Sequence, residues 1–90
     1  MGGFDYGKSG DILKAIAHPV RLKMLTGLLQ GEECNVTTMV KRLGIPQSTA
    51  SQHLNVLKAQ GIVTFRKEGV KTCYRVADAR IKKIMEALKR

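Results

Sequence analysis

One stretch of this sequence places short polar side chains at the spacing of a helix face. It runs from Gly44 to Lys58, where glycine and proline predict a turn and the residues after them predict a helix. Ser, Thr, Gln and Asn side chains both donate and accept hydrogen bonds. Reading base edges in the major groove of DNA requires that property. The polar set consists of Gln47, Ser48, Thr49, Ser51, Gln52 and Asn55.

The other side of this predicted helix is apolar, because Ala50, Leu54 and Leu57 recur at helical spacing. In helix-turn-helix proteins the N-terminal residues of the recognition helix contact the bases. Gln52 is the candidate for paired hydrogen bonds to adenine, and His53 has two candidate roles, a contact to DNA phosphate or a structural one. We assign Gln47, Ser48, Ser51 and Gln52 to the groove-facing side, with Thr49 and Asn55 near its edges.

The chain is short and strongly basic. Its 90 residues allow one domain with a small core. A net charge of +9 predicts a polyanionic partner, with nucleic acid as the leading candidate. A basic protein with a merely solvated charged surface is the alternative, but the coincidence of charge and polar helix favours double-stranded DNA. The side chains assigned to phosphates are Lys41, Arg42, Lys58, Arg66, Lys67 and Lys71.

The composition does not favour several other classes of protein. Two cysteines are too few for a disulfide-scaffolded secreted domain. No apolar run approaches the length of a membrane span, and the N-terminus lacks the order of a signal peptide, so a cytoplasmic protein is expected. There is no Gly-rich phosphate loop, no set of paired carboxylates and no Ser/His/Asp arrangement beyond chance. The sequence therefore predicts neither an enzyme nor a cofactor.

Three helices are predicted to lead up to and position the polar stretch. Residues 1–9 are glycine-rich and predict a flexible arm, and a first helix follows over about 10–17. Pro19 breaks that helix and is favourable in the first turn of the next one, which ends before Gly31. Asn35 is a good cap for a third, strongly amphipathic helix that ends at the turn.

After the polar helix the sequence changes from a helical pattern of apolar residues to segments typical of β-strands. Residues 62–67 and 70–76 are rich in β-branched and aromatic side chains, and Glu68-Gly69 is a turn signal between them. This pattern predicts a β-hairpin over about 62–76. The hairpin is basic, and a basic hairpin beside a recognition helix lies along phosphates or enters the minor groove.

A last helix is predicted over about 78–89, with Asp78 as its cap. The complete order is helix, helix, helix, turn, helix, hairpin, helix. It predicts a winged helix-turn-helix domain over 10–90, mainly α with one small β-hairpin.

Three motifs in this order resemble the ArsR/SmtB family of bacterial winged-helix repressors. They are Ala17-His-Pro-Val-Arg-Leu22, Ser48-Thr-Ala-Ser-Gln-His-Leu54, and the wing residues from Gly61 to Val76. The resemblance spans about residues 10–89. It implies a homodimer, a palindromic operator, and release from DNA on sensing a metal ion or a thiol-reactive signal.

In that family the first and last helices form the dimer interface. The resemblance therefore assigns the helices over about 10–17 and 78–89 to dimerisation. Their apolar stripes agree with this, although the same side chains would also serve to close the core of a monomer. The assigned interface residues are Ile12, Leu13, Ile16, Ile81, Ile84, Met85 and Leu88.

The metal sites of the family are not matched by this sequence. One pattern places carboxylate and His ligands on the last helix, and here Arg80 stands where a His is needed. Another uses a Cys-Val-Cys run before the third helix with a further Cys one turn on. Here the run is Cys34-Asn-Val36 with Met39 following, and one thiolate does not make a soft-metal site. We therefore predict no metal site.

The two cysteines are a candidate sensor pair. Cys34 directly precedes the cap of the third helix, a segment that in winged helices often forms a short strand beside the second strand of the wing. Cys73 lies in that second strand, and Lys71 and Arg75 share its face by strand alternation. Their positive charge favours the thiolate form of Cys73.

We hypothesise that oxidant or persulfide links Cys34 and Cys73 reversibly, which tethers the wing and lowers operator affinity. The alternative is two unrelated, partly buried thiols. Thiol-sensing members of the family often place their second cysteine in the last helix, and this chain has none there.

The function predicted from sequence is therefore a homodimeric DNA-binding repressor that a thiol-reactive signal releases from its operator. A repressor that responds to a metal or metalloid and a DNA-binding member without an inducer site are the alternatives. A protein-binding or RNA-binding winged helix is a further one, which the polar recognition helix disfavours.

Overall fold

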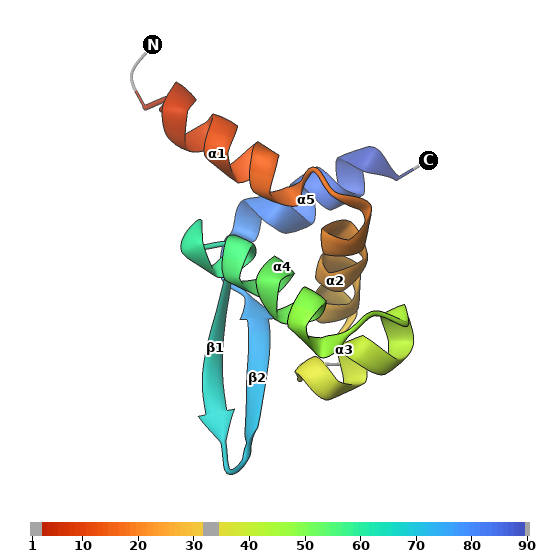
Figure 1. The fold of residues 1–90 in the computed structure, drawn as a ribbon. Helices are drawn as coiled ribbons and strands as arrows, with labels where there is room; N and C mark the ends of the chain where they lie inside the picture. Colours follow the sequence, from red (N-terminus) through yellow and green to blue (C-terminus); the bar gives the residue numbers. More distant parts are fainter. Residues whose placement is uncertain (1–2, 32–34, 90) are drawn as a thin grey trace.

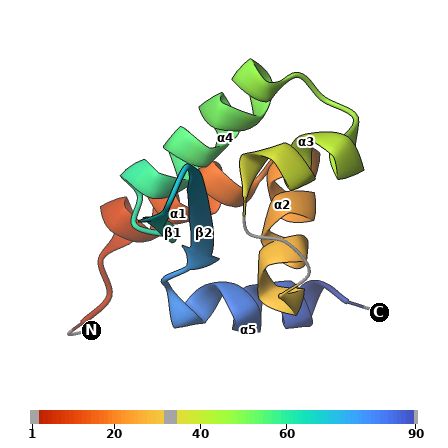
Figure 2. The same cartoon turned by 90° about the horizontal axis from the view of Figure 1, so that it is seen from below.

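The computed structural model describes residues 3–31 and 35–89, which fold into helices and an antiparallel hairpin (Figure 1). The fold is the predicted winged helix-turn-helix, with the hairpin projecting from a helical body. In Figure 2, α4 and α5 lie on opposite sides of the body with α2 between them. The elements in the described ranges are α1 (Tyr6–Ile16), α2 (Pro19–Gln30), α3 (Val36–Leu43), α4 (Gln47–Ala59), β1 (Val63–Glu68), β2 (Lys71–Val76) and α5 (Ala79–Leu88).

The first helix begins earlier than the sequence predicts. Asp5 is its N-cap, and the carboxylate of Asp5 accepts a hydrogen bond of 2.9 Å from the backbone N–H of Lys8. The boundary predicted near residue 10 is therefore wrong, and residues 6–9 are helical rather than part of an arm. A carboxylate cap stabilises a helix start and so offsets part of the helix-weakening effect of Gly7 and Gly10.

The junctions around the next two helices follow the local sequence signals. His18 caps α2 through its Nδ1 atom, which accepts from the backbone N–H of Val20 at 3.1 Å, and Pro19 occupies the first helical position. Asn35 caps α3 in the same manner. Gly44 ends α3 with a φ of 65°, a left-handed conformation that favours glycine. This glycine sets the tight turn between α3 and α4.

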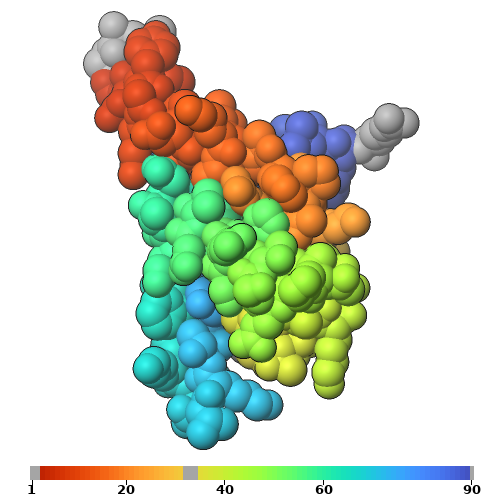
Figure 3. Space-filling view, viewed as in Figure 1, coloured from red at the N-terminus to blue at the C-terminus, as the bar shows by residue number. Residues whose placement is uncertain are grey.

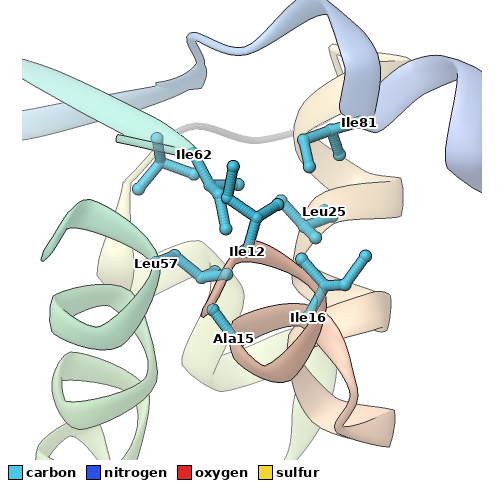
Figure 4. Close-up of a cluster of buried hydrophobic side chains, with 8 residues drawn as sticks. Ile12, Ala15, Ile16, Leu25, Leu57, Ile62 and Ile81 are labelled. Carbon is cyan, nitrogen blue, oxygen red and sulfur yellow. The ribbon is translucent and has the colours of Figure 1, made fainter. Parts of the chain in front are cut away.

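Two buried apolar clusters hold the domain together. The first joins α1, α2, α4 and α5 to the residues at the base of the hairpin (Figure 4). The second joins α2, α3 and α4 through Met24, Met39, Ala50 and Leu54. Because Ala50, Leu54 and Leu57 are all buried, the apolar side of α4 faces inward as predicted, and its polar side faces outward.

Three residues that were assigned to a dimer interface belong to the core of the single chain. Ile12, Ile16 and Ile81 are at most 4% exposed and pack with Leu25 and Leu57 (Figure 4). Their assignment to an interface is therefore wrong, because α1 and α5 turn their most central apolar residues toward the body of the domain. The other assigned residues retain exposure: Leu13 is 52% and Leu88 65% exposed, and Ile84 and Met85 are half-buried.

The hairpin has a two-residue turn at Gly69 and Val70, one position later than the predicted Glu68-Gly69. Glu68 pairs with Lys71 in the ladder, and Gly69 has a φ of 64°. Glu68 is therefore the last strand residue, since glycine alone supplies the positive φ that the turn needs. In β2, Tyr74 and Val76 pack against the core, which by strand alternation turns Lys71, Cys73 and Arg75 to the other face.

Within residues 3–31 and 35–89, no helix is long and apolar enough to cross a membrane.

Candidate nucleic-acid interface

The outward face of α4 crosses one side of the molecule above the wing (Figure 3), and it carries a strip of polar side chains. Ser48, Gln52 and Asn55 are exposed along it, and Gln47 is exposed at its start. Pro46 precedes the helix and provides no side-chain hydrogen bond to the N–H groups of its first turn. The arrangement leaves short donors and acceptors on a convex helical surface, which is the form that enters a major groove.

Two positions of α4 differ in exposure from what the sequence predicts for them. Ser51 and Thr49 are half-buried, whereas Asn55 is exposed. Asn55 lies three residues after Gln52 and seven after Ser48, so it shares their face. Ser51 lies one residue after Ala50 and three before Leu54, which places it beside the buried stripe. The most exposed polar residues along the centre of this face are therefore Ser48, Gln52 and Asn55.

The basic residues assigned to phosphates differ in their exposure and in their contacts within the chain. Lys67 and Lys71 are exposed on the wing. Arg66 is paired with Glu68 at 2.7 Å, but both side chains are largely exposed, and such pairs are weak. On α3, Lys41 is exposed, whereas Arg42 donates a hydrogen bond of 2.9 Å to the backbone carbonyl of Lys23. Lys41, Lys67 and Lys71 are thus the candidates for phosphate binding that are exposed and, unlike Arg42 and Arg66, are not described in an ion pair or hydrogen bond within the chain.

An aromatic contact between α4 and the wing was not predicted from the sequence. The Lys58 ammonium lies 4.8 Å from the centre of the Phe65 ring, and the Phe65 and Tyr74 rings are 5.6 Å apart. An exposed cation–π pair is worth about 0.5–1 kcal/mol. Lys58 therefore connects the end of the recognition helix to the wing as well as adding charge. The period-2 pattern of the hairpin contained Phe65, but it gave no indication of the lysine opposite.

His53 lies on the flank of α4 and is held by internal contacts. The Arg21 Nε donates to the His53 Nδ1 at 3.1 Å, and the rings of His53 and His18 are 4.5 Å apart. Burial, together with His18 and Arg21, lowers the pKa of His53 below its ordinary value. Of its two candidate roles, the structural one has the support of these contacts.

Cys73 lies in the middle of β2, directly opposite Arg66 in the strand register. It is half-buried, its Sγ lies 3.8 Å from the carbonyl oxygen of Tyr74, and it is part of a disulfide. Cys34 lies outside the described residues. The predicted pair therefore stays a prediction, although the oxidised state of Cys73 agrees with a redox role.

The residues that could ligate a metal are dispersed or engaged. Asp78 caps α5, and its carboxylate forms a 2.7 Å ion pair with Arg80. The hydrogen bond from Arg80 lowers the pKa of Asp78. Among the described residues, no cluster of three His, Cys, Asp or Glu side chains has metal-binding geometry.

Residues 16–65 match the model of a helix-turn-helix domain family (HTH_20), a segment that includes α2, α3, α4 and the start of the wing. An uncharacterized HTH-type transcriptional regulator of Methanocaldococcus jannaschii is 41% identical over 90% of this chain and 91% of its own length. The HTH-type transcriptional repressor SmtB of Mycobacterium tuberculosis is also 41% identical, over 78% of this chain but only 51% of its own length. The chain belongs to the ArsR/SmtB family of transcriptional repressors. These relatives are DNA-binding regulators, and none of them is described as an enzyme.

Solved structures of similar proteins have the same arrangement of elements. HlyU from Vibrio cholerae superimposes on this ArsR/SmtB-family chain with a TM-score of 0.83 at 36% identity, covering 91% of this chain and 88% of HlyU. A second structure of that protein, described as reduced HlyU, has the same TM-score and identity and covers 91% and 85% of the two chains. A homodimeric winged helix-turn-helix DNA-binding domain from Mycobacterium bovis, a possible ArsR-family regulator, has a TM-score of 0.82 at 30% identity over 98% and 86% of the two chains.

Proposed function

We propose that this ArsR/SmtB-family repressor acts as a homodimer that binds a palindromic operator through α4 and the wing of each protomer. The observation that carries the proposal is the exposed polar strip of α4 beside a basic hairpin. Ser48, Gln52 and Asn55 contact base edges in the major groove, and Gln52 forms paired hydrogen bonds to an adenine. The lysines of the wing contact phosphates and determine affinity more than sequence preference.

The proposed dimer forms through α1 and α5, on surface that the single chain leaves uncovered. Leu13 and Ile84 line a hollow between the two helices, together with Phe4. Leu88 projects from the end of α5 and is largely exposed. The similar domain from M. bovis is described as homodimeric, which supports a second copy of this chain as the partner for the hollow.

The contribution of the wing to phosphate binding can be tested at Lys71. Replacement of Lys71 by Ala is expected to weaken binding to operator and to random DNA alike, and to reduce the slope of log affinity against log salt by about 1 for each protomer of the dimer, or about 2 in all. Fluorescence anisotropy titrations over a series of salt concentrations measure both quantities. Lys82→Ala, which removes an exposed lysine from α5, is the matched control, and a slope equal to wild type for Lys71→Ala would exclude Lys71 from the phosphate contacts.

We further propose that a thiol-reactive signal releases the repressor through Cys34 and Cys73. Oxidation joins the two sulfur atoms with loss of two protons and two electrons, which reduce a peroxide to water. The positive charge of Arg66, Lys71 and Arg75 near Cys73 favours the reactive thiolate. A bond to Cys73 fixes the middle of the wing and prevents it from following the DNA surface. Two observations support this proposal. Cys73 is part of a disulfide, and one solved structure of the similar protein HlyU is described as its reduced form.

Operator affinity of reduced and oxidised protein tests the thiol switch. The reduced protein is expected to bind DNA from its own upstream region tightly, and treatment with peroxide or polysulfide is expected to weaken binding at least about tenfold, reversibly with dithiol. Cys73→Ser and Cys34→Ser should each remain in the tightly bound form after treatment. Binding that treatment leaves unchanged in the wild type would reduce both thiols to packing roles and would leave the DNA-binding proposal intact.

A further inference from the structure

One arginine connects three elements of the domain at the edge of the recognition helix. Arg21, in the first turn of α2, donates from Nη1 to the backbone carbonyl of Ala15 at 3.0 Å. From Nε it donates to the His53 Nδ1 at 3.1 Å. Ala15 belongs to the last turn of α1 and His53 to the middle of α4. A single guanidinium therefore joins a helix of the proposed dimer surface to the helix of the proposed DNA surface.

A second histidine completes this junction. The ring of His18 lies 4.5 Å from that of His53, with 51° between the ring planes. The Nδ1 of His18 is already engaged as an acceptor, because it caps α2 through the backbone N–H of Val20. Both imidazoles thus accept a hydrogen bond at Nδ1, an arrangement that requires this nitrogen to carry no proton.

We propose that Arg21 is a positioning residue for operator recognition, which fixes the rotation of α4 relative to the end of α1 through the His53 side chain. The inference rests on the proposed DNA-reading role of α4. Because His53 directly follows Gln52, a rotation of α4 that separates His53 from Arg21 also turns Gln52 within the groove. A bidentate contact to a base depends on the orientation of the Gln52 amide relative to the base edge, which such a rotation changes.

The same contact makes operator recognition sensitive to acid. A proton on the His53 Nδ1 removes the acceptor that Arg21 uses and places an imidazolium against a guanidinium. The titratable and charged groups that act on His53 in the described structure are His18 and Arg21. Burial and these two groups lower the pKa of His53, so the contact is intact at neutral pH. It is lost as the pH falls below the ordinary histidine value of about 6.5 and through the lowered value.

The direction in which operator affinity changes in acid distinguishes the positioning role from a simple effect of added charge. An added positive charge on a DNA-binding protein strengthens its attraction to phosphates. If protonation of histidine acted only through charge, operator affinity would rise in acid. The positioning role predicts the opposite for the operator, together with no loss of affinity for random DNA.

Two substitutions isolate the junction. In His53→Asn the amide oxygen takes the place of Nδ1 as acceptor for Arg21 and does not titrate. In His18→Asn the side chain retains its capping of α2, because asparagine is a favourable N-cap. The chain contains only these two histidines, so the double variant has no side chain whose unperturbed pKa lies between pH 5 and 8. Arg21→Lys retains the charge but has a single ammonium in place of the fork that reaches Ala15 and His53.

Affinities for operator and random DNA, measured from about pH 8 to about pH 5, test the proposal. At about pH 8 the wild type should bind operator more tightly than random DNA. If it does not, the DNA-reading role of α4 is overturned, whatever the role of Arg21. The wild type is expected to lose up to about tenfold in operator affinity per pH unit in acid. His53→Asn should have wild-type affinity and a flat profile, whereas His53→Ala and Arg21→Lys should discriminate poorly at every pH. A wild-type affinity that rises in acid, or His53→Ala with full selectivity and a native circular dichroism spectrum, would overturn the positioning role.

Discussion

Replacement of Gln52 by Ala is expected to weaken operator binding by about 1–3 kcal/mol for each half-site while leaving binding to random DNA almost unchanged. Gln52 is exposed in the middle of the polar strip of α4, where its amide can pair with an adenine. The substitution removes one base contact from each half-site without altering charge or the buried stripe of the helix. Parallel anisotropy titrations with operator and scrambled DNA of equal length measure the difference.

The control for this experiment is another exposed glutamine. Gln30→Ala, at the end of α2, removes the same side chain at a position outside α4 and the wing and should leave both affinities at wild-type values. Equal losses on both DNAs for Gln52→Ala would mean that Gln52 contacts the backbone rather than a base. An unchanged operator affinity would place it outside the interface.

The elements of this fold were predictable where the signals are local. Asn35 and Gly44 mark the two ends of α3 within the chain itself, and Pro46 and Gly61 bound the recognition helix. The start of α1 was missed because the glycines of the arm obscured Asp5, whose capping contact with Lys8 lies outside the apolar pattern. The turn of the hairpin was displaced by one residue, because a turn signal identifies the glycine but not the position it occupies.

The residues that pack against each apolar side chain were less predictable from the sequence than the helices and strands themselves. An apolar stripe identifies residues that must be covered, but it does not identify what covers them. Ile12 and Ile81 are therefore core residues, while Leu13 and Leu88, on the same predicted helices, remain exposed. The role of His53 was equally open, because Arg21 lies 32 positions away in the sequence. No periodicity connects these two residues, and only the tertiary structure brings them together.

The double variant Leu13→Lys and Leu88→Lys is expected to lose both the dimer and most of its operator affinity. Both side chains are more than half exposed in the single chain, so the substitutions should leave the domain folded. In the proposed dimer they place like charges on an apolar contact surface, where burial of a leucine is worth about 1.5–3 kcal/mol. The variant is expected to be monomeric at micromolar concentration. It should also lose at least about 100-fold in operator affinity, since a monomer binds one half-site without the gain from linkage.

Lysine is chosen because it makes the chain more basic. A loss of operator binding then cannot result from repulsion by phosphates. Val70→Lys, at the fully exposed tip of the wing, introduces the same side chain far from α1 and α5 and should sediment as a dimer. If the double variant also sediments as a dimer, the contact between protomers lies elsewhere. If it is a monomer that still binds the full operator with wild-type affinity, each half-site is read independently, and a dimer is not needed for operator binding.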